Sequence, residues 1–236
     1  MSGRSIGMRA IGEAIGVLVR GVRLVRSPRP IHPVGVVLEG TVEPIAGASA
    51  SSGIEWIDEP RPGAVVGRLS RGIGTPVPFP DIWGLALRFR IDETEAGDLL
   101  VSSVGNLGVP WRFVPVARLS PHGARFATVM PYRSPTGPVL VGARTITGAP
   151  ASASPAGVAI ELGRAPWTLQ LMWATPGGRW HAFATVSVRA AAAEGPGAVD
   201  RSDLRFDPVL APPPGTETYG WTRALREPGY RAARRP

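Results

Sequence analysis

The sequence predicts a mostly β-sheet fold of the α+β kind, with an antiparallel barrel as its main part. Several segments are rich in β-branched and apolar residues, and no regular alternation of strands with helices indicates a parallel sheet. The 30 glycines and 26 prolines are spread along the chain, as the turns of a barrel require. With 236 residues, 44% of them hydrophobic, the chain can bury one substantial core. We therefore expect an N-terminal helix over 1–28 and a single barrel domain over 29–236.

The first 27 residues have the pattern of an amphipathic helix, which ends at Pro28 and Pro30. Apolar residues recur at steps of three and four positions, and most of the arginines fall between them. Two interpretations remain open. The helix packs on the barrel or on a partner subunit of a homo-oligomer, or it lies on a membrane surface. The apolar positions are Ile11, Ile15, Leu18, Val22 and Val25.

After Pro33 the pattern becomes that of strands. The clearest hairpin joins 169–174 to 180–188, and we expect its Pro-Gly-Gly turn to contain positive φ angles. The other expected elements are strands over 34–42, 64–69, 83–91, 98–104 and 139–146, a short helix near 110–119, a small-residue loop over 190–199 and a helix over 220–235 that is interrupted at Pro228.

The composition excludes several kinds of site. The chain has no cysteine, which excludes disulfides, thiolate-ligated haem and iron–sulfur clusters. It has no histidine spacing typical of zinc or non-haem iron, and no nucleophile elbow. The net charge of +8 is not accompanied by an aromatic-basic stripe, so we expect no nucleic-acid partner. Without a bilayer-spanning apolar run or a recognisable signal peptide, we expect a cytoplasmic protein, with any membrane contact peripheral and through residues 1–27.

One histidine and one tyrosine have neighbours that suit catalysis. His32 lies between Pro30 and Pro33, which restrict the backbone and would hold the imidazole in place. A fixed neutral imidazole can take a proton from one peroxide oxygen and return it to the other. Tyr230 follows Arg226 by one helical turn, and a guanidinium there favours the phenolate, a good ligand for ferric iron. Each pattern alone also fits an ordinary turn residue or an ordinary aromatic residue in a basic tail.

Five segments together resemble the haem catalases and their short bacterial relatives. They occur in the order of that family, with comparable spacing, and they extend from Arg29 to Tyr230. The region of about 115–200 is much less similar. The matching segments are Arg29-Pro-Ile-His32-Pro-Val-Gly35, Gly67-Arg-Leu-Ser-Arg71, Pro80-Asp-Ile-Trp-Gly-Leu-Ala-Leu-Arg-Phe89, Asp98-Leu-Leu, and Phe206-Asp-Pro208 with a proline run to Gly215 and then Arg226-x-x-x-Tyr230.

The resemblance implies a catalase-like barrel that binds haem b. Tyr230, on a C-terminal helix, would be the axial ligand of the haem iron, and Arg226 would hold it as the phenolate. Arg29 and Arg68 would meet the haem propionates, which suits the forked guanidinium group.

On the opposite side of the ring, the resemblance implies the residues that handle peroxide. His32 would stand over the iron, and Ser70 would fix its tautomer by a hydrogen bond. The asparagine that orients peroxide in catalases falls at Ser102 or Ser103. Serine at that position predicts weak or no catalase turnover.

The implied function is that of a haem-dependent peroxidase or hydroperoxide-metabolising oxidoreductase. Its substrate would be hydrogen peroxide or an organic or lipid hydroperoxide. The alternative is a non-enzymatic barrel that binds haem or an apolar ligand, which the missing asparagine and the short chain motivate. A hydrolase such as a phosphodiesterase is a third interpretation, but no motif in the sequence supports it.

Overall fold

A computed structural model describes residues 35–47, 50–90, 96–191, 204 and 206–222. Strands dominate this part of the chain. The strands are β1 (Gly35–Pro44), β2 (Gly63–Arg71), β3 (Trp83–Arg90), β4 (Ala96–Val104), β5 (Arg125–Ala127), β6 (Tyr132–Ser134), β7 (Gly137–Thr147), β8 (Trp167–Ala174), β9 (His181–Ala190) and β10 (Glu217–Thr218). The helical elements are α2 (Glu55–Asp58), the 3₁₀ turn η1 (Trp111–Phe113) and α3 (Pro155–Arg164).

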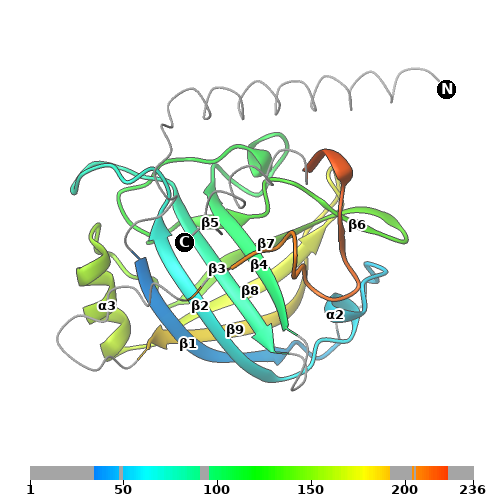
Figure 1. Cartoon of the computed structure of the whole chain (residues 1–236), viewed down its shortest axis with the longest axis horizontal. Coiled ribbons are helices and arrows are strands. Elements are labelled where there is room, and N and C mark those ends of the chain that lie inside the picture. The colour runs from blue at the N-terminus through cyan, green and yellow to red at the C-terminus, as the bar shows by residue number, and fades with distance from the viewer. Residues whose placement is uncertain (1–34, 48–49, 91–95, 192–203, 205, 223–236) are drawn as a thin grey trace.

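Eight of the described strands close into an antiparallel barrel (Figure 1). Their order is β7-β5-β4-β3-β2-β1-β9-β8, and β8 pairs back with β7. β1 to β4 form the near wall in Figure 1, and β8 and β9 form the far wall. β6 and β10 extend the sheet outside the ring. Closure removes the free edges that would otherwise expose unpaired backbone groups. The expected barrel is therefore confirmed.

The interior of the barrel is a packed apolar core. Alternate residues of the barrel strands belong to one cluster of buried side chains, as the two-residue period of a strand requires. The short helix α2 closes one end, where the Trp56 ring lies 5.0 Å from Phe89 and 5.3 Å from Phe183. Val158 and Leu162 of α3 are buried in the same cluster. A ligand is therefore to be sought on the outside of the barrel.

All the expected strands are confirmed, with boundaries that differ by at most two residues. The β8–β9 hairpin is confirmed too, but the prediction of positive φ in its turn is wrong, because Gly177 and Gly178 are not among the glycines with positive φ. A hydrogen bond from the Gly178 N–H to the Thr175 carbonyl, 3.0 Å long, closes the turn. The helix expected near 110–119 is only the 3₁₀ turn η1, since the flanking prolines cannot donate helical hydrogen bonds.

α3 is an element that the sequence interpretation missed. The Ser154 hydroxyl accepts the Gly157 N–H at 3.1 Å, and Pro155 occupies the first turn. A capping serine followed by proline is a typical start of a helix, so the signal was present. The helices expected over 1–28 and over most of 220–235 lie outside the described residues. Helical backbone does begin at Gly220 and is described as far as Thr222.

The loop before α2 is held by one carboxylate. Asp58 accepts the backbone N–H groups of Ser52 and Gly53 at 2.7 and 2.9 Å, and the hydroxyls of Ser51 and Ser52 at 2.8 and 2.9 Å. Burial by itself opposes ionisation, but these hydrogen bonds outweigh it and hold the pKa of Asp58 below its usual value. The ionised carboxylate therefore stabilises the loop that leads to the end of the barrel.

Stability in acid should depend on this carboxylate. Because its pKa is lower in the folded protein than the unfolded value near 3.8, its contribution is complete above that value and is lost as the pH falls below it. In Asp58→Asn, the unfolding free energy measured with urea should fall less between neutral pH and about pH 3 than in the wild type. Glu59→Gln, which changes an exposed neighbour, is the control. Parallel pH curves for Asp58→Asn and the wild type would contradict this assignment.

Candidate functional site

The outer face of β1 to β4 carries a row of small residues. In the strand register, Gly35 lies opposite Ser70, Ser70 opposite Gly84, and Gly84 opposite Ser102. Opposed residues point to the same side of a sheet, and each of these four is next in sequence to a residue of the core cluster. The row therefore faces outward, on the wall nearest the viewer in Figure 1. We call it the small-residue row; it lets a flat group approach the sheet closely.

Two of the predicted site residues lie beside the first residue of β1. A Cβ atom added at Gly35 would come within 2.9 Å of the Arg68 Nε and 3.0 Å of the Ser70 Cβ. Contacts this short would force the neighbours to shift, so glycine permits the close approach of β1 to β2. Ser70 is 5% exposed, and Arg68 is half-buried in the same strand. Because both occupy even positions of β2, Arg68 and Ser70 share the outer face.

The structure separates the two candidate serines of β4. Ser103 is fully buried, and its hydroxyl accepts the Trp83 N–H at 3.0 Å and donates to the Val116 carbonyl at 2.8 Å. This hydroxyl joins β4 to the start of β3 and to the following loop. Ser102 is half-buried and belongs to the small-residue row. Of the two, only Ser102 shares the outer face with Ser70.

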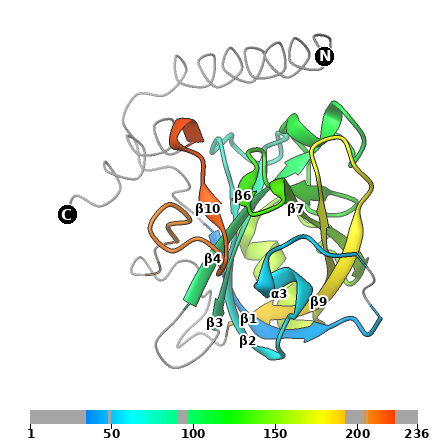
Figure 2. The same ribbon diagram turned by 90° about the vertical axis from the view of Figure 1, so that its right-hand side faces the viewer.

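An ion pair fixes the described C-terminal segment against this same side. Asp98 is fully buried and accepts the Nε and Nη2 of Arg88 at 2.7 and 2.8 Å, and also the Asp207 N–H at 2.7 Å. The hydrogen bond with Asp98 raises the pKa of Arg88. The Arg88 guanidinium also lies over the Phe206 ring, 5.2 Å from its centroid. In Figure 2 this segment runs outside β3 and β4.

The four remaining predicted site residues lie outside the described part of the chain. His32 precedes Gly35 by three positions, so the two Cα atoms are at most about 11 Å apart along any path of the chain. The described C-terminal segment starts on the outer side of the wall of β1 to β4, where the Asp207 N–H donates to Asp98 of β4, and continues to β10, which pairs with β6. Gly35, where the described part of the chain begins, lies in the small-residue row. The four residues are Arg29, His32, Arg226 and Tyr230.

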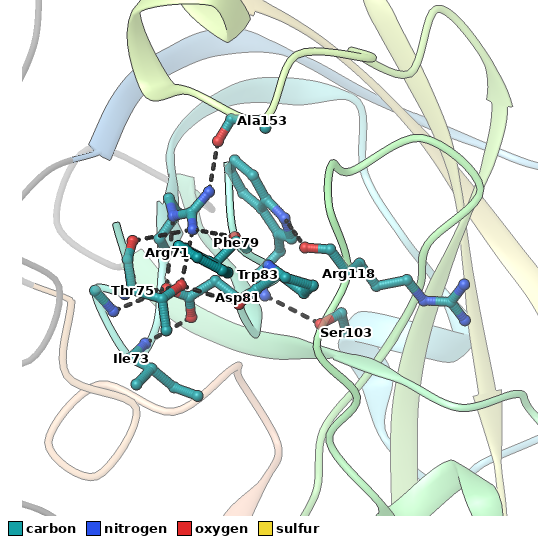
Figure 3. A network of polar contacts seen from close by, with 11 residues as sticks. Arg71, Ile73, Thr75, Phe79, Asp81, Trp83, Ser103, Arg118 and Ala153 are labelled. Carbon is teal, nitrogen blue, oxygen red and sulfur yellow. Dashed lines mark hydrogen bonds and ion pairs between the residues drawn. The ribbon is translucent and has the colours of Figure 1, made fainter. Parts of the chain in front are cut away.

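A buried ionic network lies just beyond the end of β2 (Figure 3). Asp81 is fully buried and accepts the backbone N–H groups of Ile73, Gly74 and Thr75 at 2.7, 2.8 and 2.9 Å. The Arg71 Nε lies 3.5 Å from the Asp81 Oδ2. The β2–β3 loop thus wraps around the carboxylate, and Gly74 has a φ of 80°, which glycine adopts without strain.

The arginine of this network holds three pieces of chain together. Arg71 is 5% exposed and donates to the carbonyls of Thr75, Phe79 and Ala153 at 3.0, 2.6 and 2.6 Å. Its guanidinium also lies 5.7 Å from the centroid of the Trp83 ring. The network joins the β2–β3 loop to the segment before α3. Arg71 and Asp81 both lie in the segments that resemble catalases, but the sequence analysis assigned neither of them a role. An acidic residue ten positions after an arginine is too common a pattern to predict an ion pair.

The β2–β3 loop is also tied to the β4–β5 loop. Asp81 and Arg118 exchange backbone hydrogen bonds of 3.0 and 2.8 Å, and the Trp83 Nε1 donates to the Arg118 carbonyl at 3.2 Å. The β4–β5 loop in turn contacts the β8–β9 turn. Arg112, 4% exposed, donates to the carbonyls of Thr175 and Gly178 at 3.2 and 3.0 Å, and burial lowers its pKa. Three loops are thus held in fixed positions relative to one another.

The other candidate groups form no site within the described part of the chain. His122 is exposed in a loop, and the His181 ring stacks on Trp173 with centroids 5.0 Å apart. Among the described residues, no group of three or more histidine, cysteine or acidic side chains could hold a metal ion. No helix in these ranges is long and apolar enough to cross a membrane. A surface hollow of about 280 Å³ lies between β6 and β10 and is lined by Arg133, Ser134, Pro135, Gly215 and Glu217.

Comparison with known proteins identifies the fold. No protein family and no curated protein matches the sequence. Among solved structures, a bacterial catalase matches with a TM-score of 0.58 and 13% identity, over 94% of this chain. The chain has a catalase-like fold. The match covers 59% of the length of that catalase chain. At this identity the match confirms the expected fold, and the roles of the site residues stay predictions.

Proposed function

We propose that the protein binds haem b against the outer face of β1 to β4 and acts as a peroxidase-type or hydroperoxide-metabolising oxidoreductase. The small-residue row carries this proposal, because it forms a surface without bulky side chains beside Arg68. A planar ring fits such a surface, and a guanidinium at its edge suits a propionate. When bound, haem would supply the iron centre for reaction with peroxide.

Residues of the chain would bind the iron, transfer the proton and orient the peroxide. Tyr230 would bind the iron as phenolate, with Arg226 favouring that charge state. On the side of the barrel, His32 would hold the proton that passes between the two peroxide oxygens, and the Ser70 hydroxyl would orient the imidazole. Ser102, with one short hydroxyl, would orient peroxide less firmly than an amide. Peroxidase turnover is therefore proposed to exceed catalase turnover.

Three observations support the proposal. A solved structure with a similar fold is a bacterial catalase. Gly35, three positions after His32, belongs to the small-residue row, and Asp207, which precedes Tyr230, is held by Asp98 on the same wall. The packed core disfavours the alternative of an apolar ligand inside the barrel. A haem-binding barrel without enzymatic activity remains a second candidate, which Ser102 in place of asparagine favours, and kinetics with peroxide distinguishes the two.

The iron ligand can be tested by absorption spectroscopy of protein expressed with added haem precursor. The wild type should show a Soret band with the features of a high-spin ferric, tyrosinate-ligated haem, and Tyr230→Phe should lose them because phenylalanine offers no ligand atom. Tyr219→Phe is the matched control, since Tyr219 stacks on Trp221 with centroids 6.2 Å apart. An unchanged spectrum in Tyr230→Phe would reject the axial assignment.

The same measurement tests the location of the haem. Ser102→Leu places a branched side chain in the small-residue row and should lower haem uptake at least about tenfold, because the ring can no longer approach the sheet. Ala64→Leu is the control: Ala64 is exposed, also faces outward, and lies at the other end of β2 from Ser70. Equal haem content in both variants would place the haem elsewhere. A featureless wild-type spectrum that persists after haem titration would reject the proposed function.

A further inference from the structure

Large apolar side chains are exposed on two neighbouring loops of the barrel. Ile73, Val77 and Phe79 of the β2–β3 loop are 52%, 50% and 63% exposed. Val109, Trp111 and Leu119 of the β4–β5 loop are 49%, 53% and 59% exposed. The Asp81–Arg118 hydrogen bonds hold the two loops side by side, and both lie in the upper part of Figures 1 and 2. Exposed apolar groups gathered in this way mark a surface that contacts a partner.

The loops that present these side chains are rigidly held. The backbone of the β2–β3 loop is fixed by the Asp81 carboxylate and by Arg71. The β4–β5 loop is fixed by Arg112 and by the Trp180 Nε1, which donates to the Leu107 carbonyl at 2.7 Å. Buried polar networks thus hold these apolar side chains in water. Left exposed, the side chains contribute no hydrophobic stabilisation to the fold. Such side chains suit a partner that takes them out of water.

The charge around the loops indicates the chemistry of that partner. From residue 99 to residue 160 the chain has no aspartate or glutamate, but it has five arginines. Arg125, directly after the β4–β5 loop, lies opposite Arg144 in the register of β5 and β7, and both are exposed. Arg179, on the β8–β9 turn that contacts the loop, is exposed as well. Like charges placed opposite each other destabilise a sheet unless an anion lies nearby.

We propose that these two loops dock the protein on an anionic bilayer surface. Apolar and tryptophan side chains would enter the interface between head groups and acyl chains, and the arginines would attract the acidic head groups. A nucleic acid would also attract the arginines, but five exposed aliphatic and phenylalanine side chains would gain little from a phosphate backbone. None of these exposed apolar side chains belongs to the small-residue row, so the inference does not depend on haem.

Cosedimentation of the full chain with vesicles tests the inference. The protein should bind vesicles of mixed phosphatidylcholine and phosphatidylserine more tightly than vesicles of phosphatidylcholine alone, and added salt should weaken the binding. Phe79→Ser/Trp111→Ser should weaken it at least about tenfold, because each side chain buried in the interface contributes to affinity. Leu210→Ser is the control, since Leu210 is 67% exposed but lies by the first residues of β4, at the other end from the loop.

A second pair of variants tests the charges. Arg125→Gln/Arg144→Gln should weaken binding to the mixed vesicles about tenfold, and Arg61→Gln/Arg90→Gln, with the same change in net charge at exposed sites away from the loops, should weaken it less. Residues 1–34 are present in every variant. Wild-type binding by Phe79→Ser/Trp111→Ser would therefore overturn the inference and point to another contact. Tighter binding of the protein to duplex DNA than to the vesicles, retained in that variant, would overturn it in favour of nucleic acid.

Discussion

His32→Ala is expected to slow the reaction with peroxide by about 10²–10⁴-fold while haem stays bound. The imidazole would be the group that moves a proton between the peroxide oxygens, and alanine cannot replace it. His32 is three positions before Gly35, which lies opposite Ser70 in the small-residue row. Single-turnover kinetics of peroxide with the purified haem protein measures the effect directly.

Two controls separate this role from a structural one. His122→Ala removes an exposed imidazole and should react at the wild-type rate. The Soret absorbance of His32→Ala should equal that of the wild type, because the proposed iron ligand is Tyr230. An unchanged peroxide rate in His32→Ala, with haem bound, would reject the role of the histidine. A wild-type haem protein that does not react with peroxide would favour the non-enzymatic candidate.

Asp81→Ala is expected to lower the free energy of unfolding by about 3–5 kcal/mol. The variant would leave the buried guanidinium of Arg71 without its carboxylate, and three backbone N–H groups of the β2–β3 loop without their acceptor. Unmet groups of this kind are costly because the surrounding protein excludes water. Urea unfolding followed by tryptophan fluorescence measures the loss.

Two further variants test whether the loss in Asp81→Ala comes from the buried ion pair. Glu55→Ala removes a carboxylate that is 72% exposed and 3.6 Å from Arg61, and it should have no measurable effect. Arg71→Ala/Asp81→Ala should lose less than the sum of the two single variants, because the second substitution removes a charge that has already lost its partner. A loss below about 1 kcal/mol in Asp81→Ala would show that the network contributes little to stability.

Much of the barrel could be predicted from local pattern. The strands were predicted from runs rich in β-branched and apolar residues, and the structure has each of them with boundaries that differ by at most two residues. The β8–β9 hairpin followed from two alternating arms around a Pro-Gly-Gly turn. The missed helix α3 had a readable start at Ser154 and Pro155, but it lies in the region of about 115–200, where the resemblance to catalases gave no guidance.

What the sequence by itself determined is the positions of the expected strands and the kind of fold, because the residue preferences of a strand are local. Only the tertiary structure decided that Gly35, Ser70, Gly84 and Ser102 form one row, since register depends on how four strands pair. It also decided that the Ser103 hydroxyl is buried and hydrogen-bonded to backbone groups of Trp83 and Val116. These contacts join residues far apart in the chain, and their formation depends on closure of the whole barrel rather than on any local preference.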